Sequence, residues 1–254
     1  MLTRKHTVSL KIQRTLAYFN MIWFVPLFML ILSWLGRYRC CNLQEIRDAV
    51  RKLEQENLQR PILICANHLT MIDSLLIIWF LYDFPTYLKT FRRFPWNVPE
   101  LQNFGKNPLL RLMCYLGKCI YVERSGSLET KKLTLSKLAY LLDEGESLCI
   151  FPEGGRSRTG RINRDGAVYG VGQLIQTHPQ IKVWCLYMRG LGQEQYSFFP
   201  KRGESFHLSL EMIEPQTTHT GRRADRDLTM QVMDQLVKME DAFWHDRQRY
   251  RRHG

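Results

Sequence analysis

The sequence has no Cys-x-x-Cys pair, although it contains seven cysteines. An odd number of cysteines without that spacing argues against a disulfide framework. We therefore expect free thiols in a reducing compartment, buried where the surroundings are apolar. The four cysteines inside apolar runs with strand character are Cys65, Cys119, Cys149 and Cys185. The adjacent residues Cys40 and Cys41 follow an apolar segment, where a thiol could accept palmitate.

Acidic residues are scarce, since 24 Asp and Glu oppose 36 Lys and Arg and leave a net charge of +12. This excess implies an acidic partner, and charge alone leaves nucleic acid, an anionic membrane and phosphorylated small molecules open. The sequence has neither an internal repeat nor a low-complexity segment. Hydrophobic residues make up 45% of the 254 positions, which excludes wholesale disorder and suffices for one sizeable domain.

Charge is absent from Leu16–Leu35, whose 20 residues would form a helix about 30 Å long, enough to cross a bilayer. Asn20 and Pro26 are compatible with a membrane helix, and no small-residue cleavage site follows that would mark a signal peptide. The run has basic residues on both sides, so it gives no clean orientation. We expect membrane attachment, either by a single span or by a bent helix with both ends on the cytoplasmic face. The soluble alternative is a buried core helix.

Pro61 marks the boundary between an N-terminal segment, residues 1–59, and a globular domain, residues 60–254. Residues 42–57 have helical spacing, with Asn42 as a plausible N-cap and Glu45 completing a capping box. This helix is expected to pack on the domain or to lie along the bilayer.

After Pro61, apolar runs typical of strands alternate with stretches of helical spacing. Strands are expected at 62–66, 119–123, 147–151 and 181–188. Helices are expected at 74–84, 107–116, 128–144, 166–178 and 223–244. This alternation predicts an α/β fold with a mixed, largely parallel sheet covered by helices. The intervening segment 83–106 is rich in proline and aromatic residues, and we expect it to cover a site or a membrane.

His68 follows directly on the first predicted strand, and Asp73 comes five residues later. The two side chains can meet only if His68 lies in the turn and Asp73 in the first turn of the next helix. An aspartate there could fix the imidazole's tautomer and leave the other nitrogen to accept a proton from a hydroxyl. A turn histidine beside a helix-starting aspartate without catalytic purpose is the alternative, because this spacing alone is common.

The segment from Phe151 to Gly160 carries more information. The predicted strand ends in Pro-Glu-Gly-Gly, where two glycines allow close backbone approach, and Arg156, Arg158 and Arg161 then cluster. Such a turn can bind a phosphate through guanidinium and backbone N–H groups. Another predicted strand ends at Arg124. Parallel strands would bring His68, Arg124 and Arg156 to the same sheet edge, which favours an active site.

These blocks, in order, are Asn67–Asp73, Tyr121–Arg124, Phe151–Arg156 and the apolar strand Ile181–Met188. The set resembles the glycerolipid acyltransferases of the lysophosphatidic acid acyltransferase (1-acyl-sn-glycerol-3-phosphate acyltransferase) type over roughly residues 60–190. An N-terminal membrane-embedded helix is also usual in that family. Gly155 departs from the family's Thr or Ser, and this version of the block resembles that of glycerol-3-phosphate acyltransferases.

The resemblance implies an acyltransferase domain at 60–254, with His68 as general base and Asp73 as its orienting partner. The acceptor hydroxyl would attack the thioester of acyl-CoA or an acyl carrier protein, with no metal and no cofactor. Its phosphate would be held by five residues of the later blocks, which are Arg124, Glu153, Gly154, Gly155 and Arg156. The implied acceptor is 1-acyl-glycerol-3-phosphate, a lysophospholipid, and the product is phosphatidic acid.

Alternatives within this class are acylation of glycerol-3-phosphate or of another lysolipid. A noncatalytic, membrane-bound lipid-binding protein on the same fold is a rival from another class. No nucleic-acid-binding module accompanies the basic tail 247–254, so an anionic membrane is the expected partner rather than nucleic acid. We expect the domain on the cytoplasmic face of the membrane, the inner or plasma membrane if the source is bacterial.

Overall fold

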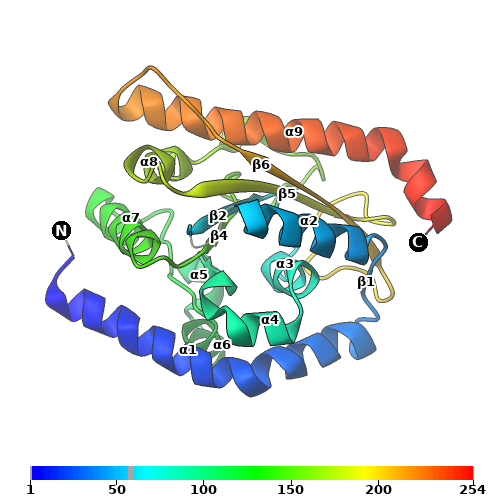
Figure 1. Cartoon of the computed structure of the whole chain (residues 1–254), viewed down its shortest axis with the longest axis horizontal. Coiled ribbons are helices and arrows are strands. Elements are labelled where there is room, and N and C mark those ends of the chain that lie inside the picture. Colours follow the sequence, from blue (N-terminus) through cyan, green and yellow to red (C-terminus); the bar gives the residue numbers. More distant parts are fainter. Residues whose placement is uncertain (1, 57–59, 254) are drawn as a thin grey trace.

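The computed structural model describes residues 2–56 and 60–253 (Figure 1). Over these residues one six-stranded sheet has the order β1-β6-β5-β2-β4-β3. The β5–β6 pair is antiparallel and the other pairs are parallel. The strands are β1 (Arg39–Cys40), β2 (Ile62–Ala66), β3 (Trp96–Asn97), β4 (Leu148–Ile150), β5 (Lys182–Gly190) and β6 (Ser205–Ile213). The expected α/β class with a mixed, mostly parallel sheet is confirmed.

Helices cover both faces of the sheet, with α1 to α4 on one side and α7 to α9 on the other (Figure 1). Strand β2 is buried along its whole length, which explains why its sequence is continuously apolar rather than alternating. The helices are α1 (Arg4–Leu30), α2 (Leu43–Glu56), α3 (Asp73–Leu81), α4 (Phe84–Lys89), α5 (Leu101–Phe104), α6 (Pro108–Leu116), α7 (Leu128–Asp143), α8 (Gly170–Thr177) and α9 (Gly221–His253).

Two expectations about the sheet region were wrong, and one strand was missed. Residues 119–123 form no continuous strand and pair only through two isolated bridges, Asn97 with Cys119 and Glu100 with Val122. Residues 83–106 do not form a covering loop. They fold into α4, a 3₁₀ turn, β3 and α5, and bury aromatic side chains such as Tyr87 and Trp96 in the core. Strand β6 was not expected at all.

Asn42 does not cap α2 with its side chain. Its amide pairs with the backbone of Leu208 in β6, donating to the carbonyl at 2.8 Å and accepting from the N–H at 3.2 Å. Helix α2 buries Ile46 and Val50 against the domain, so it packs as an ordinary amphipathic helix. The seven cysteines are free, and Cys65, Cys149 and Cys185 are buried as expected, whereas Cys119 is only half-buried.

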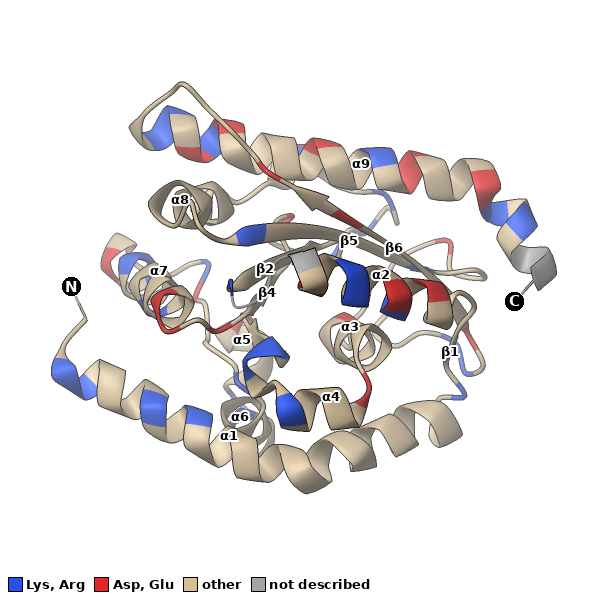
Figure 2. Cartoon of the chain, in the orientation of Figure 1, with Lys and Arg blue, Asp and Glu red and all other residues tan. Residues whose placement is uncertain are grey.

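Helix α1 continues into a π-helical turn, Ile31–Leu35, and together they are long and apolar enough to cross a membrane by length and composition. The helix lies along one side of the domain, with its charged residues confined to the N-terminal half (Figure 2). Gln13 donates to the carbonyls of Tyr115 and Cys119, both at 3.0 Å, and Asn20 donates to that of Leu116. These amides satisfy carbonyl groups at and just beyond the end of α6.

The opposite face of α1 is exposed and apolar. Its exposed large side chains are Val8, Ile12, Leu16, Tyr18, Phe19, Ile22, Trp23, Leu27 and Leu30, followed by Ile31, Trp34 and Leu35 in the π-helical turn. The neighbouring α6 exposes Leu109, Leu110 and Leu112. An apolar surface of this extent is unusual for a protein that contacts only water.

Candidate active site

His68 and Asp73 meet at the end of β2. The Nδ1 atom of His68 lies 2.9 Å from Oδ2 of Asp73, and Asp73 is the first residue of α3. This is the only arrangement in which the five-residue spacing allows contact, with the histidine in the turn and the aspartate in the helix's first turn. Because Nδ1 faces a carboxylate, it carries the proton, and Nε2 is left as the basic nitrogen.

Asp73 is held rigidly, because it accepts hydrogen bonds from the whole turn that precedes it. Its Oδ2 also accepts the backbone N–H groups of Leu69 at 2.6 Å and Thr70 at 2.8 Å, and its Oδ1 accepts the hydroxyl of Thr70. The ring of His68 stacks on Phe151, with centroids 4.1 Å apart and planes inclined by 16°. The imidazole is therefore fixed by the carboxylate at its edge and by the aromatic ring on its face.

Asn67 fixes the start of this turn in the sheet. Its side chain donates to the carbonyl of Met188 at 3.0 Å and accepts the N–H of Met188 at 2.8 Å. The asparagine amide thus continues the β2–β5 pairing where the chain leaves β2. Asn67, the residue before His68, therefore fixes where the histidine turn leaves the sheet.

Glu153 and Ser157 join the 151–160 turn to the His68 turn. The carboxylate of Glu153 accepts the backbone N–H of His68 at 3.0 Å and that of Asn163 at 2.9 Å, and the N–H of Ser157 donates to the carbonyl of His68 at 2.9 Å. Burial raises the pKa of Glu153 to about 7, although both N–H groups favour the carboxylate. Glu153 is directed into the protein rather than toward solvent, since it is only 5% exposed.

The two glycines of the turn have different surroundings. Gly154 has φ +66°, and a Cβ there would lie 2.7 Å from Val168, so the position requires glycine. A Cβ on Gly155 would meet only the Nη1 atom of Arg124, at 3.2 Å. Arg124 is paired through Nε with Glu100 at 2.8 Å and is half-exposed. The structure therefore brings Arg124 to the turn, although the segment before it forms two isolated bridges and not the expected strand.

Arg156 packs against a pair of aromatic rings that sequence reasoning missed. Its guanidinium carbon is 4.8 Å from the ring centroid of Tyr196 and 5.1 Å from that of Phe198. The Nη1 atom is buried and has no hydrogen-bond partner among the described residues. The 196–198 loop is joined to the histidine turn, because Ser197 N–H donates to Leu69 and Met71 N–H to Phe198. The only sequence signal was the aromatic-rich stretch 196–199 just before Lys201 and Arg202, and nothing in the sequence links that stretch to Arg156.

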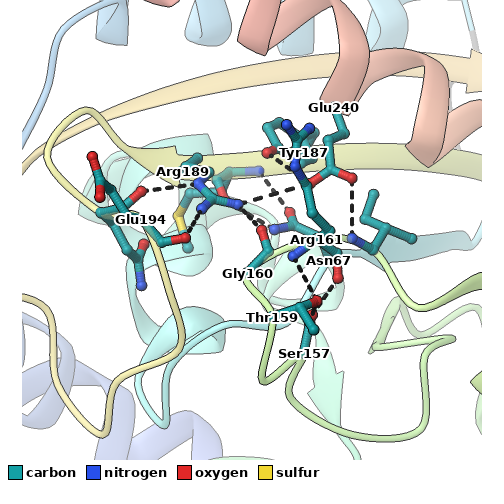
Figure 3. Close-up of polar contacts among 12 residues, drawn as sticks. Asn67, Ser157, Thr159, Gly160, Arg161, Tyr187, Arg189, Glu194 and Glu240 are labelled. Atoms are coloured by element: carbon teal, nitrogen blue, oxygen red, sulfur yellow. Dashed lines mark hydrogen bonds and ion pairs between the residues drawn. The ribbon is translucent and has the colours of Figure 1, made fainter.

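The other arginines of the segment diverge from Arg156. Arg161 stacks on Trp244 of α9 at 4.2 Å, and Arg158 is exposed. Behind the turn, the buried Arg189 of β5 binds the carbonyl groups of Gly160 and Glu194 (Figure 3). The arginine cluster expected from the sequence is thus divided. Arg156 packs on the 196–198 loop, and Arg124 lies against Gly155.

Comparison with known protein families shows which family the chain belongs to. A family model described as acyltransferase matches residues 49–189, more than half of the chain. The chain belongs to the acyltransferase family. The match contains the histidine turn and the 151–160 turn of this acyltransferase, whereas the loop carrying Tyr196 and Phe198 lies beyond it. A search of curated protein sequences finds no match to this acyltransferase.

Proposed function

We propose that the protein transfers a fatty acyl chain from an acyl thioester to the hydroxyl of a lysophospholipid, with 1-acyl-glycerol-3-phosphate as the acceptor. The observation that carries this proposal is the 2.9 Å contact between His68 and Asp73 beside an arginine-bearing turn. Membership of the acyltransferase family supports the reaction class. The acyl donor is acyl-CoA or an acyl carrier protein.

In the proposed reaction, Nε2 of His68 accepts the proton of the acceptor hydroxyl as its oxygen attacks the thioester carbonyl. Collapse of the tetrahedral intermediate breaks the carbon–sulfur bond, and the imidazolium returns the proton to the departing thiolate. Asp73 stabilises the imidazolium between these steps and preserves the tautomer. Neither a nucleophilic side chain of the enzyme nor a metal ion takes part in this scheme.

Arg156 and Arg124 are proposed to hold the acceptor's phosphate. Arg156 is only partly buried, so N–H groups of its guanidinium can bind an anion, and the aromatic rings beside it keep its plane fixed. Arg124 is half-exposed and lies against Gly155, so its remaining N–H groups can reach the same anion. Fixing the phosphate aligns the hydroxyl with His68, which is a large part of such catalysis.

For Glu153 we propose a positioning role in place of the phosphate contact that the family resemblance implies. Both of its oxygens are occupied by backbone N–H groups, and a carboxylate would repel a phosphate dianion. Glu153 instead sets the distance between the histidine turn and the arginine turn. Gly154 and Gly155 contribute by leaving space for Val168 and for Arg124.

We further propose that α1 lies in the surface of an anionic membrane rather than crossing it. One side of the helix is anchored to the domain through Gln13 and Asn20, while the other side is apolar along nearly its whole length. A helix that crossed the bilayer would have to leave these partners and expose α6 carbonyl groups. Basic residues in its first half would meet lipid phosphates.

The test is release of free thiol by the purified full-length protein from a long-chain acyl-CoA and from the same chain on acyl carrier protein. The acceptor panel contains 1-acyl-glycerol-3-phosphate, glycerol-3-phosphate, and lysophospholipids with larger headgroups. We expect turnover with 1-acyl-glycerol-3-phosphate to exceed the others. A preference for glycerol-3-phosphate, which the Gly155 version of the turn favours, would reassign the acceptor. Absence of turnover with every pair would favour a noncatalytic lipid-binding protein.

A further inference from the structure

Arg189 is a buried cation that none of the proposed catalytic steps uses. The residue is 1% exposed and lies near the end of β5. Its Nε donates to the carbonyl of Gln193 at 3.1 Å, its Nη2 to that of Glu194 at 2.7 Å, and its Nη1 to that of Gly160 (Figure 3). One guanidinium therefore binds carbonyl groups from two separate segments of the chain.

The charge of Arg189 is compensated by α9. The carboxylate of Glu240 lies 3.7 Å from Nη1, and the ring of Trp244 lies 4.6 Å from the guanidinium carbon. Glu240 also accepts the N–H of Ile162 at 3.0 Å, just beyond the arginine turn. A buried guanidinium needs such a set of partners, because an unpaired charge in the interior is strongly destabilising. This arrangement joins α9 to the end of the turn.

The two segments that Arg189 joins are those on either side of Arg156. Gly160 ends the turn that carries Arg156, and Gln193 and Glu194 begin the loop that carries Tyr196 and Phe198. The segments touch at Gly160, which has φ +71° and where a Cβ would collide with the carbonyl oxygen of Glu194. The aromatic rings can flank Arg156 only while these segments stay together.

We propose that Arg189 is a positioning residue that fixes Arg156 for the acceptor phosphate by holding the 151–160 turn against the 193–198 loop. This inference rests on the proposed function, in which Arg156 binds that phosphate. Arg189 is too deeply buried to contact the substrate, so its effect passes through the carbonyl groups of Gly160, Gln193 and Glu194. The His68–Asp73 pair depends on its own turn and should keep its geometry.

The experiment compares Arg189→Met and Arg189→Lys with the wild type in the thiol-release assay. Methionine removes all three donors, and we expect the KM for the acceptor to rise by about tenfold while kcat and the donor KM change little. Lysine keeps the charge but replaces the planar, three-nitrogen guanidinium with a single nitrogen on a shorter stem, which cannot span the positions of Nε, Nη1 and Nη2. We therefore expect its acceptor KM to lie between those of the wild type and Arg189→Met. Should Arg189→Met fail to fold, the lysine variant alone decides.

Lys118→Met is the matched control. Lys118 is equally buried and binds the carbonyl of Phe94 at 2.6 Å and the carboxylate of Glu146 at 2.5 Å, without contact to the turn or the aromatic loop. We expect it to lower the melting temperature and leave the acceptor KM unchanged. An acceptor KM that is unchanged in both Arg189 variants, or that rises as much in Lys118→Met, would overturn the inference.

Calorimetric titration with glycerol-3-phosphate separates this inference from the proposed function. A wild-type protein that shows no turnover but binds the phosphate, with weaker binding in Arg189→Met, would remove the acyl-transfer proposal and keep the role of Arg189. A wild type that binds no phosphate ligand in either assay would contradict both.

Discussion

Gly155 and Arg124 come from different segments of the chain, yet a Cβ on Gly155 would lie 3.2 Å from the Nη1 atom of Arg124. Gly155 stands where the resembled family has Thr or Ser. It is thus the residue that faces Arg124, one of the two arginines proposed to bind the phosphate. Absence of a side chain at position 155 lets the guanidinium lie directly against the turn. We interpret Gly155 as a determinant of acceptor choice.

Gly155→Thr should displace the end of Arg124, which is flexible and can move, so the fold should be retained. We expect the acceptor KM to rise by about tenfold and the preference among acceptors to change, because one of two phosphate-binding guanidinium groups shifts. The measurement is KM for each acceptor in the panel. Gly154→Thr is the contrasting variant, since φ +66° and the contact with Val168 should make it destabilising. Equal acceptor preferences in wild type and Gly155→Thr would contradict this interpretation.

Glu153 should make stability depend on pH in an identifiable direction. Its pKa in the folded protein is raised to about 7 from the ordinary 4.5, so between these values the folded state binds more protons than the unfolded state. The contribution of this carboxyl to stability is therefore full below pH 4.5 and is lost as the pH rises to about 7. The loss amounts to about 3 kcal/mol.

Glu153→Gln removes this titration. We expect the difference in free energy of unfolding between wild type and variant to decrease from pH 4.5 to 7, measured by denaturant unfolding at several pH values. A difference that stays constant across this range would show that Glu153 titrates normally in the folded protein.

The apolar face of α1 provides a prediction with an internal control. Leu30 on α1 and Leu128 on α7 are exposed to nearly the same extent, 60% and 62%. Leu30→Glu should weaken binding to anionic lipid vesicles by at least about tenfold, because it removes a leucine side chain that would contact the lipid and adds a negative charge. Leu128→Glu should bind as the wild type does. Equal vesicle binding by the two variants would contradict the proposed membrane surface.

The sequence predicted those parts of the site that depend on neighbouring residues. The contact of His68 with Asp73 follows from a strand end and a helix start five residues apart. This prediction needs only local spacing, which is why it agrees with the structure. Arg124 also reaches the 151–160 turn, although residues 119–123 form two isolated parallel bridges instead of the strand on which that prediction was based.

Contacts between distant segments could not be predicted in this way. Tyr196 and Phe198 reach Arg156 because Arg189 binds carbonyl groups of both the 151–160 turn and the 193–198 loop. Every residue has a backbone carbonyl group, so the sequence does not reveal which ones an arginine will bind. Asn42 is a good N-cap by its local sequence, but its side-chain amide binds the backbone N–H and carbonyl groups of Leu208 instead. Strand β6 did have a signal, since Phe206, Leu208, Leu210 and Met212 alternate with polar residues.

The most direct measurement of the central proposal is thiol release by His68→Ala. We expect turnover to fall by about a thousandfold or more, with circular dichroism and melting temperature close to those of the wild type. His178→Ala is the matched control, because His178 also faces a carboxylate, that of Asp143 at 3.3 Å, and lies outside the site. His178→Ala should retain turnover. Retained turnover in His68→Ala would contradict general-base catalysis by His68.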